Sequence, residues 1–177
     1  YKEIGNDLTF LYNKINSSNK TIVDFLKENG LDENEITVNA PEIVDMIAER
    51  YSSNQSNYRY NVTQVITVAS SKVDLVRRLI NEQSELLKQG IAITGGDYMY
   101  RVKYEYSDLN SIKPQMIEEA TKNARTAAQK FASDSDSKLG KIKRASQGQF
   151  SISDRDEFTP YIKKVRVVTT IDYFLED

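Results

Sequence analysis

The sequence predicts an α+β fold of two layers, in which about three helices pack on a mixed or antiparallel sheet. Segments with apolar residues three or four positions apart lie between segments in which apolar and polar residues alternate. The alternation predicts a sheet with one covered face and one wetter face, which favours mixed or antiparallel pairing. The length of 177 residues suits a single domain, which we place over residues 1–177.

The first helix is predicted over residues 5–30, where apolar side chains recur at near-helical spacing. Asp7 or Asn6 is a candidate N-cap, and Gly30 is suited to end the helix. The next segment, EITVNAPEIVDMIAERY, begins with a short strand and continues as either a second strand or a helical turn. The apolar repeat of the helix predicted over residues 5–30 consists of Leu8, Leu11, Ile15, Ile22, Phe25 and Leu26.

Residues 57–70 predict one strand, and residues 71–90 predict an amphipathic helix that ends at Gly90. The segment IAITGGDYMYRVKYEYSD predicts a further strand with a bulge or bend at Gly95 and Gly96. One face of the strand at residues 57–70 would carry Tyr60, Val62, Gln64, Ile66 and Val68, and the helix stripe would carry Val73, Val76, Leu79, Ile80, Leu86 and Leu87.

The last helix is predicted at about residues 111–133, with Asp108 or Asn110 as its cap. Small side chains recur along one of its faces, so we expect this helix to lie close to the sheet, with Phe131 filling a larger gap. Two strands follow, LGKIKRASQGQFSI and KKVRVVTTIDYFLE. The expected helix face is Ile117, Ala120, Ala124, Ala127, Ala128 and Phe131, and the last strand alternates through Val165, Val167, Thr169, Ile171, Tyr173 and Leu175.

The composition narrows the chemistry that the chain can perform. Cysteine and histidine are both absent, which excludes cysteine-containing zinc sites, cysteine nucleophiles, Ser-His-Asp triads and disulfides. The net charge of −2 disfavours a dedicated nucleic-acid binder, and no apolar run approaches the roughly 20 residues that span a bilayer. We therefore expect no catalytic residue, no metal, no cofactor, no nucleic-acid partner and no membrane span within this chain.

Alternating tyrosines mark the segment DYMYRVKYEY. Tyr98, Tyr100, Tyr104 and Tyr106 would share one face of the predicted strand. Tyrosine packs well across a sheet, and this interpretation is favoured. The alternative is that the rings stack on the bases of a single-stranded nucleic acid, although no RNP-like pattern accompanies them.

Basic residues gather in the segment LGKIKRASQG. Lys141, Lys143 and Arg144 form a candidate surface for phosphate, anionic lipid or an acidic partner, with Lys138 before them and Lys163, Lys164 and Arg166 as candidate neighbours. Acidic residues flank the segment, and this favours a solvated face. A small-molecule or anion-binding module centred on these three residues or on the tyrosine strand remains an alternative function.

The ordered set of segments resembles the SIMPL-domain family of bacterial cell-envelope proteins over nearly the whole chain. The resemblance rests on FLKENGLDENEITV, on YRYNVTQVITVASSKVDLVRRLINEQSELLKQGIAI, on the alanine-rich helix that runs into LGKIKRASQG, and on KKVRVVTTIDYFLE. Each pattern is soft by itself, so the order of the patterns carries the specificity. Family members usually have a strand before the first helix, and here only its tail, YKEIG, is expected.

The resemblance implies a helix-backed sheet in a periplasmic or envelope-associated protein whose leader or anchor has been removed. It brings no catalytic motif. It implies self-association into a homo-oligomer or binding of a protein partner in the envelope, and a link to stress protection. We therefore expect a non-enzymatic envelope protein.

Overall fold

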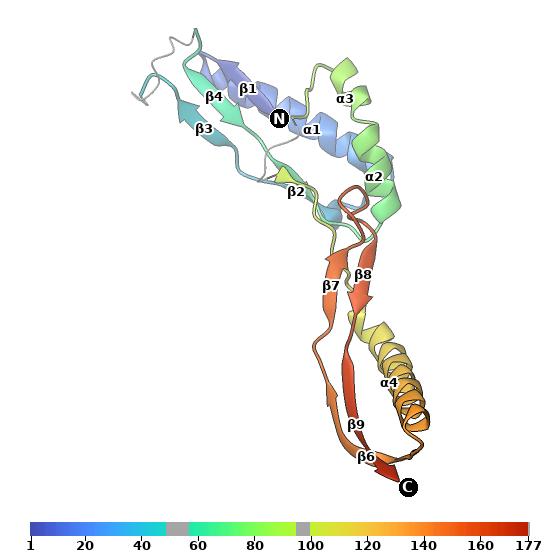
Figure 1. The fold of residues 1–177 in the computed structure, drawn as a ribbon. Helices are drawn as coiled ribbons and strands as arrows, with labels where there is room; N and C mark the ends of the chain where they lie inside the picture. Colours follow the sequence, from blue (N-terminus) through green and yellow to red (C-terminus); the bar gives the residue numbers. More distant parts are fainter. Residues whose placement is uncertain (49–56, 95–99, 177) are drawn as a thin grey trace. The chain divides into compact units, whose positions relative to one another are not determined.

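The computed structural model describes residues 1–48, 57–94 and 100–176 (Figure 1). The chain divides into two compact units, residues 1–101 and 102–177. Helices and antiparallel strand pairs make up both units, which confirms the α+β class. Among the described residues the strands form four separately hydrogen-bonded sheets, whereas the alternation had predicted one.

Helix α1 spans Leu8–Glu28, as its apolar spacing predicts. The side chain of Asp7 caps the helix by accepting a hydrogen bond of 2.9 Å from the backbone N–H of Phe10. Beyond the helix, Gly30 adopts φ +102°, a conformation that side chains other than that of glycine rarely tolerate. Both predicted ends of this helix are therefore confirmed.

Unit 1 contains two small antiparallel sheets. Strands β1 (Lys2–Gly5), β4 (Tyr60–Thr63) and β3 (Glu42–Asp45) form a sheet in the order β1-β4-β3. Strand β2 (Ile36–Val38) pairs with β5 (Ile66–Val68). The segment YKEIG is thus itself a strand, and the ambiguous residues after Pro41 form β3.

The single strand predicted over residues 57–70 is divided between these two sheets. At the division, the side chain of Gln64 is 1% exposed, and its Nε2 donates to the carbonyls of Asn39 at 2.6 Å and Val65 at 3.0 Å. These two bonds satisfy the buried Nε2 donor where the chain changes from one sheet to the other, because a buried N–H group needs an acceptor within the protein. Alternation alone cannot reveal such a change of partner.

Two apolar clusters form the core of unit 1. Leu11, Ile15 and Val62 join α1 to the β1-β4-β3 sheet, and Leu11 is 1% exposed. Ile22 and Leu86 form the second cluster together with Ile91. The first cluster fixes α1 on the sheet, and the second fixes α3 on α1.

The helix predicted over residues 71–90 is broken into α2 (Val73–Asn81) and α3 (Ser84–Lys88). Gly90 follows with φ +78°, which agrees with the predicted end. The break allows Leu86 to be buried at 2% exposure, whereas the adjacent Leu87 is 58% exposed. One continuous apolar stripe is therefore replaced by two shorter ones.

Unit 2 is a two-stranded β-ribbon with one helix, α4 (Leu109–Asp134), packed on β9 and β6 (Figure 1). Strand β6 (Lys138–Gln147) pairs with β9 (Thr169–Glu176), and β7 (Ser151–Asp154) pairs with β8 (Lys163–Arg166). The N–H of Gly148 donates to the carbonyl of Val168 at 2.8 Å, between the two ladders.

The packed face of α4 differs in part from the predicted one. Ala124 and Ala128 are half-buried, and Ala132 is 2% exposed, so the face advances by four residues at each step. Phe131 and Ala127 are exposed, Phe131 at 76%. The prediction that Phe131 fills a gap is wrong, because the small side chain of Ala132 holds the position next to the ribbon.

This arrangement makes a direct prediction for α4. Ala132→Leu should lower the free energy of unfolding of unit 2 by about 1–3 kcal/mol, because the added atoms must enter a packed contact. Ala127→Leu on the same helix is the matched control and should change stability by less than about 0.5 kcal/mol. Urea denaturation followed by circular dichroism measures both. Equal stability of the two variants would contradict the packing described for this face.

Candidate functional site

The tyrosine segment does not form the predicted strand. Described residues 101–108 carry no regular secondary structure, and Tyr98 lies outside the described residues. Tyr100 is 41% exposed, whereas Tyr104 and Tyr106 are half-buried. The ring of Tyr104 packs edge-to-face on that of Tyr161, with the centroids 6.0 Å apart. The prediction of a common strand face is therefore wrong for the described tyrosines, because this segment packs through its side chains without a ladder partner.

The predicted basic residues Lys141, Lys143 and Arg144 are exposed on β6. Ile142 lies opposite Tyr173 on β9 and Arg144 lies opposite Asp172, so Lys143 is an extra residue with no partner of its own in the ladder. Such a bulge re-aims side chains.

The bulge brings the side chain of Lys143 near the ring of Phe174 on β9. The ammonium of Lys143 lies 5.8 Å from the centroid of its ring. A second shift of register lies between Leu139 and Ile142 and contains Gly140. A Cβ on Gly140 would come within 3.0 Å of the Phe174 carbonyl, so glycine permits the strands to approach closely here.

Next to the bulge lies an open pocket of about 270 Å³, lined by Arg144, Ser146, Thr170 and Asp172. Its walls are polar and solvated, with one cation and one anion, and no buried side chain contributes to them. Exposure alternates along β9: Thr169, Ile171 and Tyr173 are half-buried, and the residues between them are exposed. We infer that the pocket lies on the ribbon face turned away from α4.

Lys138 lies on β6 with the three central cations, whereas Lys163, Lys164 and Arg166 belong to the second ladder. Lys163 on β8 lies opposite Asp154 on β7 and forms an ion pair with it. Within the described part of the chain, Lys141, Arg144 and Asp172 enter no ion pair. These three charges of the β6–β9 ladder are therefore free to meet an outside partner.

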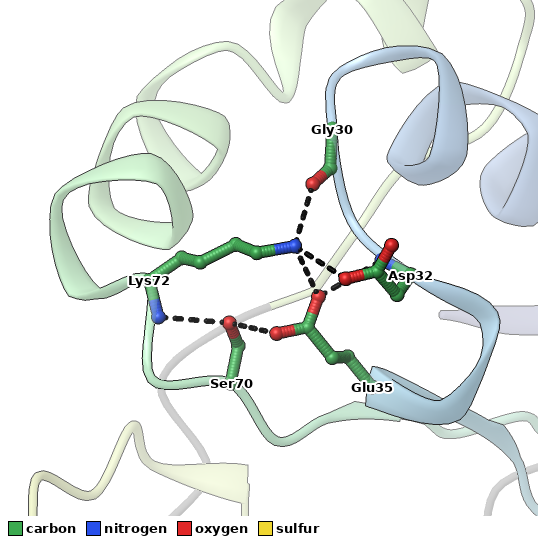
Figure 2. Close-up of polar contacts among 5 residues, drawn as sticks. All are labelled: Gly30, Asp32, Glu35, Ser70 and Lys72. Carbon is green, nitrogen blue, oxygen red and sulfur yellow. Dashed lines mark hydrogen bonds and ion pairs between the residues drawn. The ribbon is translucent and has the colours of Figure 1, made fainter.

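A polar cluster that the sequence patterns do not predict joins the turn after α1 to the start of α2 (Figure 2). The ammonium of Lys72 donates to the carbonyl of Gly30 at 3.0 Å, to Asp32 at 2.6 Å and to Glu35 at 3.0 Å. The hydroxyl of Ser70 donates to the other carboxylate oxygen of Glu35 at 2.6 Å and accepts from the N–H of Lys72. A signal for part of it was present in the sequence, since DENE matches the capping box of the 3₁₀ turn Glu33–Glu35.

Electrostatics keeps this cluster charged. The N–H of Asp32, the hydroxyl of Ser70 and the ammonium of Lys72 lower the pKa of Glu35 from 4.5 to about 2. Hydrogen bonds from Lys72 to the carboxylates of Asp32 and Glu35 raise the pKa of Lys72. A general acid or base needs a pKa near the working pH, whereas these shifts move both groups away from it. The cluster is therefore a structural contact that holds the turn after α1 to the start of α2.

The depressed pKa of Glu35 makes stability depend on pH. The folded value lies below the unfolded one, so the contribution is complete above about pH 4.5 and is lost as the pH falls toward about 2. At pH 7, the Glu35→Gln variant should have a lower Tm than the wild type. Between pH 7 and about pH 3, the Tm of this variant should fall by less than the Tm of the wild type. Glu33→Gln, whose side chain is 88% exposed, is the control and should follow the wild type. Parallel acid profiles of wild type and Glu35→Gln would contradict this assignment.

Among residues 1–48, 57–94 and 100–176, no three acidic side chains are grouped so that they could hold a metal ion. Asp134 pairs with Lys130 at 2.8 Å. Asp156 accepts hydrogen bonds from Thr159 and Arg155 within its own turn, and these bonds lower its pKa to about 2. Both carboxylates have local structural partners.

The family model described as SIMPL, a protein of unknown function (DUF541), matches residues 1–168. No curated protein matches the chain. Among the helices of residues 1–48, 57–94 and 100–176, none is long and apolar enough to cross a membrane.

Proposed function

Because the chain belongs to the SIMPL family, we propose that it is a non-enzymatic protein of the periplasm or cell envelope that acts by self-association. Binding of a protein partner through the same surface is the alternative form of this proposal. The observation that carries it is the exposed apolar surface of the β6–β9 ribbon. An apolar surface beside strand edges that have no ladder partner among the described residues is suited to contact with another chain.

Large apolar side chains are exposed along this ribbon. Ile142 on β6 is 53% exposed, Phe174 on β9 is 52% exposed and Leu175 is 59% exposed. Val168, at the junction of the two ladders, is 51% exposed. Single exposed apolar residues are ordinary, but several on one two-stranded ribbon are typical of an interaction surface.

The rival functions have less support. An anion-binding module would need a built pocket, and the pocket at Arg144 is open and includes the carboxylate of Asp172. Nucleic-acid binding would need a row of stacked rings, but Tyr104 packs on Tyr161 and residues 101–108 form no strand. The ion pairs and hydrogen bonds of the described residues also single out no set for acid–base or nucleophilic catalysis.

Self-association can be tested through Phe174. Phe174→Asp should lower the average mass in light scattering, because it places a charge in the apolar contact, and we expect at least a tenfold weaker association. Phe158→Asp is the matched control, since Phe158 is 90% exposed and lies between β7 and β8, outside both ladders. An equal effect of the two substitutions would contradict the assignment of the contact to the β6–β9 ribbon.

The envelope location and the link to stress protection are tested in cells. Fractionation of the source organism should recover the full-length protein outside the cytoplasm, and a deletion strain should be more sensitive to peroxide. Recovery in the cytoplasmic fraction would remove the envelope part of the proposal, and unchanged sensitivity would remove the stress-protection part.

A further inference from the structure

The two strands of the β6–β9 ribbon divide its charges between them. Strand β6, KLGKIKRASQ, contains four cationic residues and no acidic one. Strand β9, TTIDYFLE, contains two acidic residues and no cationic one. All six charged residues are exposed: Lys138, Lys141, Lys143, Arg144, Asp172 and Glu176.

Each strand has one hydrogen-bonded neighbour. In the part of the chain that the structure describes, β6 pairs with β9 and with no other strand, and the same holds for β9. Each strand therefore has a second edge whose backbone N–H and C=O groups lie outside the ladder. Such an edge can add a strand from another chain.

Charge decides which edges fit each other. Like charges that face each other across two strands oppose pairing. Pairing of two β6 edges would place cations opposite cations, and pairing of two β9 edges would place carboxylates opposite carboxylates. A β6 edge beside a β9 edge brings opposite charges together and repeats the combination already present within each ribbon. The partner that complements β6 is thus the β9 of a second copy.

We propose that copies of this chain associate head to tail, with the free β6 edge of one ribbon pairing with the free β9 edge of the next. This inference rests on the proposed self-association and assigns its geometry. The contact uses two different surfaces, so each added copy offers a new edge, and the assembly closes as a ring or continues as a filament. Its mass exceeds that of a dimer and falls as salt screens the charges.

Two variants, each with the charges of one strand reversed, test the pairing between the β6 edge of one copy and the β9 edge of the next. One variant carries Lys141→Glu, Lys143→Glu and Arg144→Glu, which leave β6 with three acidic residues and one cation, and a second carries Asp172→Lys and Glu176→Lys on β9. Each variant alone has matching signs on both edges, so light scattering should find each as a monomer. An equimolar mixture should assemble again, because the acidic β6 edge of one variant meets the basic β9 edge of the other. A control with Lys103→Glu, Lys164→Glu and Arg166→Glu, three exposed residues outside β6 and β9, has the charge change of the first variant and should assemble like the wild type.

The outcomes separate this inference from the proposed function. If the wild type assembles and the acidic β6 variant assembles equally well, head-to-tail pairing is overturned while self-association stands. If the mixture stays monomeric, the losses come from the ribbon inside each copy, and the inference is again overturned. A wild type that is monomeric at every concentration overturns the proposed self-association together with the inference.

Discussion

Leu11→Ala is expected to lower the free energy of unfolding of unit 1 by about 2–5 kcal/mol. Leu11 is 1% exposed and packs with Ile15 and Val62, so truncation leaves a cavity between α1 and the sheet. A Cβ on Gly5 would already lie 3.3 Å from a methyl group of Leu11, which shows how closely β1 approaches this side chain. Little room exists for α1 to move inward and fill the space.

Urea denaturation followed by circular dichroism measures this loss. Leu8→Ala is the matched control, because Leu8 belongs to the same helix and is 44% exposed. Leu8→Ala should lower the free energy of unfolding by less than half as much as Leu11→Ala. A loss below about 1 kcal/mol for Leu11→Ala would contradict the position of the first core cluster.

The second large effect is expected at Leu86. Leu86→Ala should also lower the free energy of unfolding of unit 1 by about 2–5 kcal/mol, because this side chain is 2% exposed and packs with Ile22 and Ile91. Leu87→Ala is its control, one residue away in the same short helix and 58% exposed.

The comparison between these two leucines tests the break between α2 and α3. An uninterrupted helical stripe makes Leu86 and Leu87 both members of one apolar face, as the sequence predicts. The structure buries Leu86 alone. Equal losses of stability for the two variants would favour the continuous helix and contradict the break.

The sequence predicts the helices well and the strand partners poorly. Periodicity and capping residues place α1 and α4 almost correctly, because Asp7, Gly30 and the apolar spacing all act within one helix. Alternation also identifies the half-buried face of β9 as far as Tyr173, but it is wrong for Leu175, which is 59% exposed. These are local effects, and the residues that cause them are adjacent in the chain.

Long-range contacts account for what the sequence does not predict. The division of residues 57–70 between two sheets depends on Gln64 and the distant Asn39, and the polar cluster joins Lys72 to residues about 40 positions earlier. Phe131 is exposed because Ala132 contacts the ribbon, and helical spacing alone does not choose between adjacent residues. The basic segment was found from its composition, but the bulge at Lys143 depends on register against β9.

The measurement that tests the central claim most directly is the mass of the wild-type protein in solution. Light scattering across micromolar concentrations should give an average mass above that of a monomer, which rises with concentration or settles at a fixed multiple. Assembly should weaken at high salt, because opposite charges on β6 and β9 contribute to it. A strict monomer at every concentration would contradict self-association as the function of this chain.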